Sequence, residues 1–369
     1  MFPEVKKNFG FGCMRLPTTK LGLIDYKELD KMVDAFMAAG FNYFDTARGY
    51  MFMRSEKALK KSLTSRYKRE DYILTDKLSS GFFRKEEDIR PLFEKQLKAC
   101  GVDYFDFYLM HAQEKKVYEK YKACRAYETA FELKKEGKIK HVGLSFHDKA
   151  EVLDEILTDY PEIEVVQIQF NYVDYDDPSV EGKKCYDVCR KHNKPIIVME
   201  PVKGGALVNL PQEAKEIFKS LGEASVASYA IRYCASFEGI FMVLSGMGSM
   251  DMMRDNVSYM SDFKPITEEE MKAIGKVKAI YRAQNLIQCT GCKYCIDGCP
   301  KNIPIPDLFA CLNDKKTNNS FNSSYYYSIH VKRGGKASDC IGCGKCEQAC
   351  PQHLEIRKLL KDVAKEFGK

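Results

Sequence analysis

The chain has 369 residues, of which 45% are hydrophobic and 30% charged, which is enough apolar material for a large core and a smaller second domain. Its formal charge of +6 comes from 58 basic and 52 acidic residues scattered along the chain, so no basic block indicates nucleic-acid binding. No signal peptide is apparent, and no run approaches the roughly 20 apolar residues that span a bilayer. We therefore expect a cytoplasmic protein without nucleic-acid or membrane partners.

Short apolar runs of the kind that form buried strands recur through the first two-thirds of the chain, and polar residues follow each one. Between the runs, apolar residues such as Leu29, Val33 and Phe36 return at the spacing of one helical face, which predicts amphipathic helices. The predicted strands are Phe9–Arg15, Phe41–Phe44, Tyr72–Thr75, Asp103–Met110, Val142–Leu144, Val165–Ile168, Pro195–Met199 and Gly239–Leu244.

Four polar residues at the ends of predicted strands recur at a nearly constant interval. Asp45, Lys77, His111 and Ser145 are spaced 32, 34 and 34 residues apart. That interval holds one strand, one helix and two loops, so a βα unit repeats and each polar residue lies at the carboxyl end of its strand. The sequence therefore predicts an α/β fold, a (β/α)8 barrel with its active site at the carboxyl ends of the strands.

The residue types at these strand ends suit proton transfer to a carbonyl group. Tyr50 can hand a proton to a carbonyl oxygen, but its usual pKa of about 10 makes it a weak acid at neutral pH. We expect Lys77 to lower the pKa of Tyr50, and Asp45 to hold Lys77 charged and oriented. His111 would orient the substrate. Each of these residues alone could have a purely structural role. Their occurrence together at the ends of successive strands favours catalysis.

Two glycine-containing turns offer a place for a phosphate. Lys203-Gly204-Gly205 follows the seventh predicted strand, and Ser245-Gly246-Met247-Gly248-Ser249 follows the eighth, just before a helix that starts near Met250. Barrels often hold phosphate between these loops and a helix N-terminus. A nucleotide cofactor that brings a nicotinamide for hydride transfer fits that position.

Six short motifs occur along the barrel region: Phe44-Asp45-Thr46-Ala47-x-x-Tyr50, Thr75-Asp76-Lys77, Leu109-Met110-His111, Gly143-Leu144-Ser145, Glu200-Pro201 and Asp255-Asn256. In this order, over about residues 9–280, the chain resembles the aldo-keto reductase superfamily. The resemblance implies a catalytic tetrad of Asp45, Tyr50, Lys77 and His111. It also implies that Ser145 and Gln167 hold the nicotinamide amide and that Asp255 and Asn256 lie near the adenosine.

Two departures from the family pattern concern the cofactor. The family often stacks an aromatic ring on the nicotinamide from the seventh strand, whereas the matching position here is Met199, a softer platform. Members that prefer NADP place a Lys or Arg near the 2′-phosphate, whereas Gly246–Met253 contains no cation and Arg254 is the nearest one. NADH is therefore slightly favoured over NADPH.

Eight of the 15 cysteines form two patterned runs near the C-terminus, and a cytosolic chain would keep them reduced. The runs are Cys289-x2-Cys292-x2-Cys295-x3-Cys299-Pro300 and Cys340-x2-Cys343-x2-Cys346-x3-Cys350-Pro351. This is the spacing of bacterial ferredoxins, in which the fourth cysteine of each run binds the other cluster. We therefore assign one [4Fe–4S] cluster to Cys289, Cys292, Cys295 and Cys350, and the other to Cys340, Cys343, Cys346 and Cys299.

A pair of zinc sites is the alternative for these cysteines, and the x3-Cys-Pro endings argue against it. The remaining cysteines show no such spacing and are expected to be packed thiols: Cys13, Cys100, Cys124, Cys185, Cys189, Cys234 and Cys311.

We therefore expect two domains, a TIM barrel at residues 1–283 and a small α+β ferredoxin-like domain with two [4Fe–4S] clusters at residues 284–369. The whole chain resembles the branch of the aldo-keto reductases that carries such a domain. This implies an oxidoreductase that acts on a small-molecule carbonyl substrate with NADH or NADPH and uses the clusters for electron transfer.

The cofactor types leave two alternatives open. A nicotinamide moves two electrons as hydride and a cluster moves one, so a flavin or an external ferredoxin- or flavodoxin-type carrier is another way to complete the electron path. Nicotinamide would then not be the main donor. A redox sensor without catalysis is the third reading, against which the complete tetrad argues.

Overall fold

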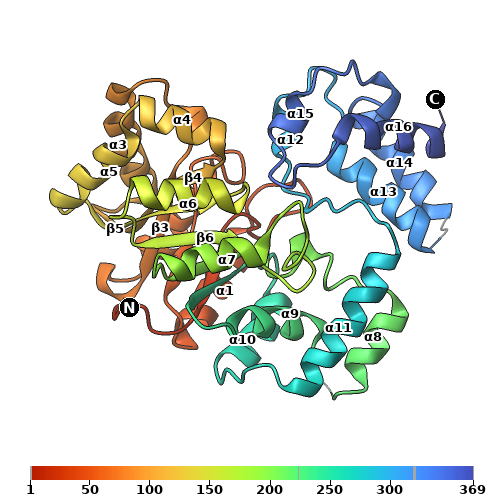
Figure 1. The fold of residues 1–369 in the computed structure, drawn as a ribbon, viewed down its shortest axis with the longest axis horizontal. Coiled ribbons are helices and arrows are strands. Elements are labelled where there is room, and N and C mark those ends of the chain that lie inside the picture. Colours follow the sequence, from red (N-terminus) through yellow and green to blue (C-terminus); the bar gives the residue numbers. More distant parts are fainter. Residues whose placement is uncertain (1, 223, 319–320, 369) are drawn as a thin grey trace. The chain divides into compact units, whose positions relative to one another are not determined.

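The computed structural model describes residues 2–222, 224–318 and 321–368, and within them eight parallel strands form a closed barrel (Figure 1). The strands pair in chain order, and β8 closes the ring on β1 through Gly10 and Leu244. They are β1 (Phe9–Gly12), β2 (Tyr43–Asp45), β3 (Ile73–Leu78), β4 (Phe105–Gln113), β5 (Ile139–Phe146), β6 (Val165–Gln169), β7 (Ile196–Met199) and β8 (Ile240–Ser245). The predicted (β/α)8 barrel is confirmed.

The chain divides into two compact units, Met1–Pro201 with Ala227–Thr267, and Val202–Val226 with Glu268–Lys369. This division differs from the predicted boundary at residue 283, because residues 202–226, which follow β7, and residues 268–283 belong to the second unit. The helices of the barrel unit are α1 (Tyr26–Ala38), α2 (Ser55–Leu59), α3 (Ile89–Cys100), α4 (Lys115–Ala123), α5 (Ala126–Lys135), α6 (Ala150–Asp159), α7 (Gly182–Lys191), α9 (Val226–Ala235) and α10 (Met250–Met260).

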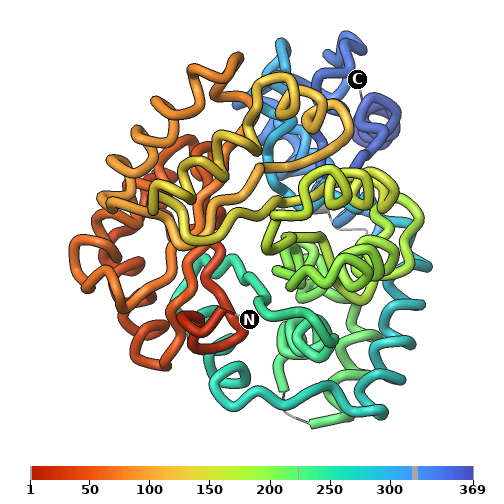
Figure 2. Tube along the Cα trace, turned by 60° about the vertical axis from the view of Figure 1, so that its left-hand side comes forward, coloured from red at the N-terminus to blue at the C-terminus, as the bar shows by residue number. Residues whose placement is uncertain are grey.

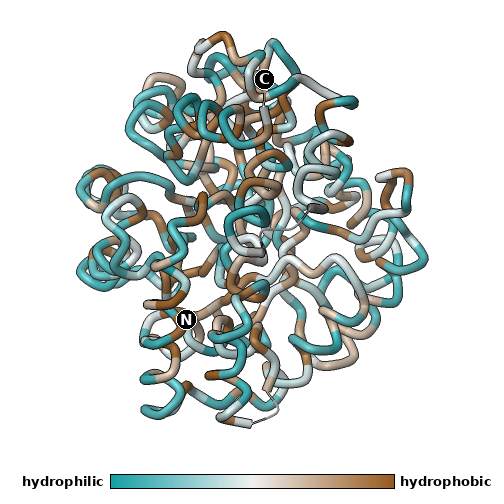
Figure 3. Tube along the Cα trace, turned by 90° about the vertical axis from the view of Figure 1, so that its right-hand side faces the viewer, coloured by the Kyte–Doolittle hydropathy of each residue, from teal (hydrophilic) through white to brown (hydrophobic). Residues whose placement is uncertain are grey.

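These helices are amphipathic, as the spacing of their apolar residues predicts. Leu29, Val33 and Phe36 of α1 are fully buried, and Figure 3 shows hydrophilic and hydrophobic residues interspersed along the chain. Helix α3 ends at Gly101, which adopts a left-handed conformation (φ 70°) that a residue with a side chain would resist. No helix in the described ranges has the length and apolar composition needed to cross a membrane.

The second unit consists of helices joined by loops, among its described residues. Its helices are α8 (Gln212–Lys219), α11 (Glu268–Ala283), α12 (Tyr294–Asp297), α13 (Ile305–Asn318), α14 (Phe321–Arg333), α15 (Lys345–Gln348) and α16 (Ile356–Phe367). Leu308 and Phe309 of α13 pack with Leu360 and Val363 of α16 in a small buried core. The region after residue 284 was predicted to be α+β, and the helices found there around the cysteine runs leave no strand among the described residues.

Residues 2–7 close the amino end of the barrel. The Phe2 ring lies 4.8 Å from that of Phe107 on β4 and 5.0 Å from that of Phe241 on β8, against the apolar interior of the barrel. Figure 2 shows this segment in red beside the label N. Asn42 ties it down through both groups of its amide, which bonds to the carbonyl oxygen of Glu4 and to the N–H of Lys6. We call residues 2–7 the N-terminal strap.

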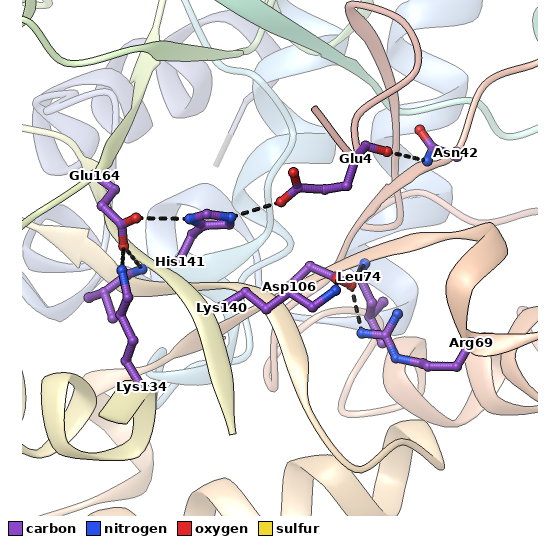
Figure 4. Close-up of polar contacts among 10 residues, drawn as sticks. Glu4, Asn42, Arg69, Leu74, Asp106, Lys134, Lys140, His141 and Glu164 are labelled. Carbon is purple, nitrogen blue, oxygen red and sulfur yellow. Dashed lines mark hydrogen bonds and ion pairs between the residues drawn. The ribbon is translucent and has the colours of Figure 1, made fainter. Parts of the chain in front are cut away.

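His141 connects the strap to the strands (Figure 4). One ring nitrogen lies 2.8 Å from Glu4 Oε1 and the other 2.8 Å from Glu164 Oε2, which also pairs with Lys134 through its second oxygen. Nearby, the buried carboxylate of Asp106 forms ion pairs with Arg69 at 2.6 Å and with Lys140 at 2.9 Å. These contacts stabilise the end of the barrel opposite to the catalytic candidates.

Candidate active site and cysteine sites

Asp45 and Lys77 form a buried ion pair at the carboxyl ends of β2 and β3. Lys77 Nζ lies 2.6 Å from Asp45 Oδ1 and donates a second hydrogen bond of 2.8 Å to the carbonyl oxygen of Thr46. The Lys77 side chain is fully buried. A charge taken out of water needs this kind of paired and hydrogen-bonded setting, so the ammonium is fixed in place as the sequence predicts.

Tyr50 lies against both Lys77 and His111. The Lys77 ammonium is 4.9 Å from the centre of the Tyr50 ring, and the His111 ring meets it edge to face at 5.9 Å. Burial, followed by the charge of Asp45, raises the pKa of Tyr50 well above its usual value. The predicted lowering by Lys77 is therefore wrong, because burial and the Asp45 charge outweigh any effect of the ammonium on the pKa of Tyr50.

His111 is held by a residue that the sequence reasoning missed. Ser79 Oγ lies 2.6 Å from His111 Nδ1, and Ser79 follows two residues after Lys77 on the next loop. Burial and the Lys77 charge lower the pKa of His111 well below its usual range, so the imidazole is neutral at physiological pH. The only signal for Ser79 was a hydroxyl residue just beyond a predicted strand end.

Strand β4 continues past His111, where the sequence predicted its end. The register between β4 and β5 shifts between Met110 and Gln113, and Ala112 adopts a positive φ of 51°. This bulge turns the backbone N–H of Ala112 toward Ser145 Oγ, which accepts it at 2.8 Å. The hydroxyl of Ser145 thus lies beside the residue that follows His111.

The loop after Tyr50 is in an unusual conformation. Met51, Phe52 and Met53 all have positive φ, between 53° and 62°, a region that costs about 1–2 kcal/mol for each residue with a side chain. Hydrogen bonds from the N–H groups of Arg54 and Ser55 to the carbonyl oxygen of Tyr50 hold this left-handed turn. Strain of this kind, next to a proposed acid, indicates that the position of Tyr50 is determined by its surroundings.

Side chains from the second half of the barrel reach the same end. Ser145 and Gln167 are direct neighbours in the β5–β6 register, and Gln167 Nε2 lies 3.4 Å from Asp45 Oδ2. Met199 ends β7 opposite Gln169 and is half-buried. The structure therefore brings Ser145 and Gln167 to the Asp45 side of the barrel and places Met199 on the adjoining strand end.

The predicted adenosine-side residues are partly assembled. Asn256 Nδ2 donates to Ser245 Oγ at 2.8 Å, and both side chains are buried. Gly246 is exposed, and a Cβ there would meet the Arg15 side chain at 3.6 Å, while Asp255 is half-buried on α10. These four residues, Ser245, Gly246, Asp255 and Asn256, share the junction of β8 with α10.

Gly204 lies in the second unit and has a packing role there. It adopts φ +64°, and a Cβ at this position would approach the carbonyl oxygen of Thr290 to 2.2 Å. Only glycine allows the turn 203–205 to lie this close to the backbone between Cys289 and Cys292. The predicted contact of this turn with a phosphate stays a prediction.

A carboxylate caps the start of α10. The backbone N–H of Met250 donates to Glu28 Oε1 of α1 at 3.0 Å, and Ser249 accepts from the N–H of Met252. A negative side chain at a helix N-terminus is favourable in itself, but it also repels a second anion placed there. Glu28 was not singled out from the sequence, because α1 and α10 are far apart along the chain.

The eight patterned cysteines gather around two separate recesses in the second unit. Cys289, Cys292, Cys295 and Cys350 line one, of about 300 Å³, together with Ile305 and Phe309. Cys299, Cys340, Cys343 and Cys346 line the other, of about 320 Å³. In both, three thiols come from one run and the fourth from the other, and each set of four sulfur donors in an apolar wall fits an iron–sulfur cluster.

The remaining cysteines lie away from these recesses. Cys13, Cys100, Cys124, Cys185, Cys189, Cys234 and Cys311 are buried thiols within hydrophobic surroundings. Burial raises the pKa of Cys189 well above its usual value, which keeps this thiol protonated and unreactive. Their structural role agrees with the absence of ligand spacing in the sequence.

Comparison with known families gives two matches. The model of the Aldo/keto reductase family covers residues 8–279, and that of the 4Fe-4S dicluster domain covers residues 288–354. The chain belongs to the aldo/keto reductase family. Since its relatives are oxidoreductases, this aldo/keto reductase is an oxidoreductase with a C-terminal 4Fe-4S domain.

Individual relatives are distant. Dihydrodiol dehydrogenase 3 of Bos taurus is 25% identical over 283 residues, which are 69% of this chain and 84% of that protein. The NADH-specific methylglyoxal reductase of Escherichia coli is 26% identical over 206 residues, 48% of this chain and 57% of that protein. The 4-dihydromethyl-trisporate dehydrogenase of Mucor mucedo is 35% identical, but the match spans only 30% of its length.

Solved structures share the barrel. An aldo-keto reductase from Klebsiella pneumoniae in complex with NADPH superimposes with a TM-score of 0.60 at 16% identity, over 74% of this chain and 95% of that one. The holo form of AKR11C1 from Bacillus halodurans gives a TM-score of 0.59 at 24% identity, over 74% of this chain and 92% of that one. At these identities the likeness establishes the fold.

Proposed function

We propose that this aldo/keto reductase reduces or oxidises a small carbonyl compound with NADH or NADPH, with Tyr50 as the residue that exchanges the proton. The observation that carries the proposal is the buried Lys77–Asp45 pair, 2.6 Å long, packed against the Tyr50 ring. A buried pair of this kind is costly, and its place beside a phenol and a neutral imidazole matches the needs of acid catalysis.

The protonation states support reduction of the carbonyl. Because burial keeps Tyr50 protonated, with its pKa well above the usual value, its hydroxyl is able to donate to a carbonyl oxygen. His111 is neutral and fixed through Nδ1 by Ser79, so its other ring nitrogen is oriented to bind the same oxygen. Lys77 provides positive charge that stabilises the oxyanion as it forms.

The nicotinamide cofactor supplies or accepts the hydride when it is bound. Two strand-end polar side chains, Ser145 and Gln167, would hold its amide group, and Met199 would pack against the ring. Ser245, Gly246, Asp255 and Asn256 would bind the nucleotide half, with Gly204 proposed for a phosphate contact. Exposed Gly246 leaves its backbone open for a close approach of the cofactor.

NADH is favoured by the charge at α10. Glu28 occupies the helix N-terminus, at the junction where the family places the 2′-phosphate of NADPH, and Gly246–Met253 has no cation to offset it. A 2′-phosphate carries negative charge of its own, so the Glu28 carboxylate would repel it. The relative from Escherichia coli is named as NADH-specific.

The two sets of four cysteines would each bind one [4Fe–4S] cluster, which supplies one electron at a time. An external ferredoxin- or flavodoxin-type protein would exchange these electrons, and a bound flavin is the alternative route between one-electron and two-electron chemistry. The cytoplasmic location stays a prediction from the sequence.

Turnover by a Tyr50→Phe variant tests whether Tyr50 exchanges the proton with the substrate. With methylglyoxal and NADH, we expect kcat to fall at least about 100-fold while NADH binding is unchanged, because only the proton donor is removed. Tyr325→Phe, a matched change at an exposed tyrosine, should leave kcat unaltered. Unchanged turnover in Tyr50→Phe would remove the basis of the proposal and favour the redox-sensor reading.

A second measurement separates the electron routes. We would add NADH to the anaerobically purified protein and follow the visible absorbance of the iron–sulfur clusters. Bleaching would mean that electrons pass from NADH to the clusters through a mediator such as a flavin. Unchanged absorbance with NADH bound would mean that hydride chemistry and cluster chemistry have separate partners.

A further inference from the structure

The two cysteine runs repeat one local structure. Cys289-Thr290-Gly291-Cys292 corresponds to Cys340-Ile341-Gly342-Cys343, and the glycine of each has a positive φ, 67° and 73°. A short helix follows in both cases, α12 after the first run and α15 after the second, and the two helices contact each other. Corresponding positions can therefore be compared directly.

The residue after the first cysteine is buried in one run and exposed in the other. Thr290 is 3% exposed, because the turn 203–205 packs on its backbone through Gly204. Ile341 at the equivalent position is 61% exposed. The chain covers one half of the repeat with its own segment and leaves the other half open, with an apolar side chain at its centre.

The open half also carries the most accessible thiol. Cys343 is the exposed member of the eight patterned cysteines, whereas its counterpart Cys292 is half-buried. Electron exchange between proteins requires close approach to a cluster, and an exposed ligand shortens the path through the protein. The recess of Cys299, Cys340, Cys343 and Cys346 is thus the more accessible of the two.

Positive charge surrounds this opening. Lys301 lines the recess beside Ile341, and Lys345 follows Cys343 by two residues; both are exposed, and neither forms an ion pair within the described residues. Of the nearby carboxylates, Glu347 pairs with Arg357 at 2.7 Å and Asp339 accepts the N–H of Lys336, while Asp297, which precedes Gly298 beside Lys345, is exposed. The rim therefore presents cations around an apolar centre.

We propose that Ile341, Cys343, Lys301 and Lys345 form the docking surface for an acidic ferredoxin-type protein that exchanges electrons with the Cys299, Cys340, Cys343 and Cys346 set. The inference rests on the cluster ligands of the proposed function and adds a site to them. An apolar centre with a charged rim is the usual anatomy of a transient protein interface, and opposite charges speed the encounter.

Each docking event transfers one electron. The reduced ferredoxin loses it, the cluster at this set gains it, and no proton or bond is exchanged. Two such events deliver two electrons to the iron–sulfur clusters, and the reduced ferredoxin is the only reductant that this transfer needs.

The test uses the full-length holoprotein, purified without oxygen, and a plant-type [2Fe–2S] ferredoxin as the acidic probe. We would measure its affinity by calorimetry at low and high salt, and the rate at which the reduced probe bleaches the cluster absorbance. The variants are Lys301→Glu with Lys345→Glu, and separately Ile341→Thr, which installs the residue of the covered half. Lys316→Glu on α13 is the matched control.

We expect the double variant to bind the ferredoxin at least about tenfold more weakly at low salt and to lose most of the salt dependence. Ile341→Thr should lower affinity without changing that salt dependence. Lys316→Glu should behave as the wild type, and iron content should be equal throughout. A cationic cytochrome of similar size should show no binding to the wild type.

Three results would overturn the proposal: no binding of ferredoxin by the wild type, equal affinity in all variants, or an equal loss with Lys316→Glu. The proposed carbonyl chemistry is scored separately on the same preparations. Reduction of methylglyoxal by NADH should be unaltered in the docking variants, and its absence from the wild type would count against the proposed function without bearing on the docking surface.

Discussion

The ammonium of Lys77 is fully buried, and its charge is compensated by one carboxylate and one carbonyl oxygen. Asp45 Oδ1 and Thr46 O are its hydrogen-bond partners. In this setting the removal of Asp45 leaves a charge without compensation, which costs far more than the pair itself contributes. The pair is therefore better understood as a device for position than as a source of stability.

Asp45→Asn should lower the free energy of unfolding by about 3–5 kcal/mol and abolish turnover. The physical reason is the uncompensated Lys77 charge in the barrel. Urea unfolding followed by circular dichroism measures it. Asp34→Asn, which breaks the exposed pair with Arg66, should cost no more than about 1 kcal/mol. Equal losses in the two variants would contradict the assignment of Lys77 as charged.

Glu28→Gln should shift cofactor preference toward NADPH. Removal of the carboxylate at Met250 N–H takes away the repulsion of a 2′-phosphate, and we expect the ratio of kcat/KM for NADH over NADPH to fall about three- to tenfold. Glu94→Gln, an exposed carboxylate on α3, should leave this ratio unaltered. A constant ratio in Glu28→Gln would show that the 2′-phosphate lies elsewhere.

Single elements were predicted well where their pattern is local. Helix α1 was expected from apolar spacing, and all eight strands were expected from short apolar runs. Errors arose where a distant contact decides the structure. Strand β4 runs on to Gln113 because β5 pairs with it through a bulge.

The same distinction explains the site. The four catalytic candidates were predicted because they lie at or just after the carboxyl ends of β2, β3 and β4, whereas Ser79 and Glu28 act through residues far along the chain. The pKa of Tyr50 was predicted in the wrong direction because burial and the orientation of Lys77 are three-dimensional facts. Residue type and spacing predict which groups meet, and the balance of burial against charge follows only from the folded geometry.

Glu164, which is connected to the N-terminal strap through His141, should make the free energy of unfolding depend on pH. Burial alone would raise the pKa of Glu164, but hydrogen bonds from His141, Lys134 and the N–H of Val142 lower it to about 2, from an unfolded value of 4.5. A lowered folded pKa stabilises the protein above about pH 4.5, and this contribution is lost as the pH falls toward about 2.

We expect Glu164→Gln to lose about 2 kcal/mol at about pH 7, after allowance for partial exposure, and nearly nothing at about pH 2. Urea titrations at the two pH values measure the difference. Glu162→Gln, the exposed neighbour, should show no such pH dependence. A loss that is equal at both pH values would mean that packing rather than charge stabilises the strap.

At the scale of the whole molecule, the boundary between units does not follow the boundary between sequence motifs. Residues 202–226 leave the barrel after β7 and join the cysteine-bearing unit, where Gly204 packs on Thr290. The sequence could not predict this, since nothing in the segment resembles a ferredoxin. Glycine at position 204 is explained by that contact.

Cys350→Ser should remove one cluster from the recess formed mainly by the first run. We expect iron to fall by about four atoms per chain, and the cluster of Cys340, Cys343 and Cys346 to persist, because the fourth ligands are exchanged between runs. Iron analysis with electron paramagnetic resonance of the reduced protein measures both. Cys311→Ser, a buried thiol outside the recesses, should keep all the iron.

Because each recess takes its fourth cysteine from the other run, the four ligands of one cluster are synthesised at different times. Cys295 leaves the ribosome 55 residues before Cys350, so its set of four thiols stays incomplete for about 3–11 s at about 5–20 residues per second. During that interval three thiols with no fourth partner are open to oxidation or to a wrong metal. Insertion of the cluster held mainly by the first run therefore has to wait for Cys350, the last of the eight ligands to be synthesised.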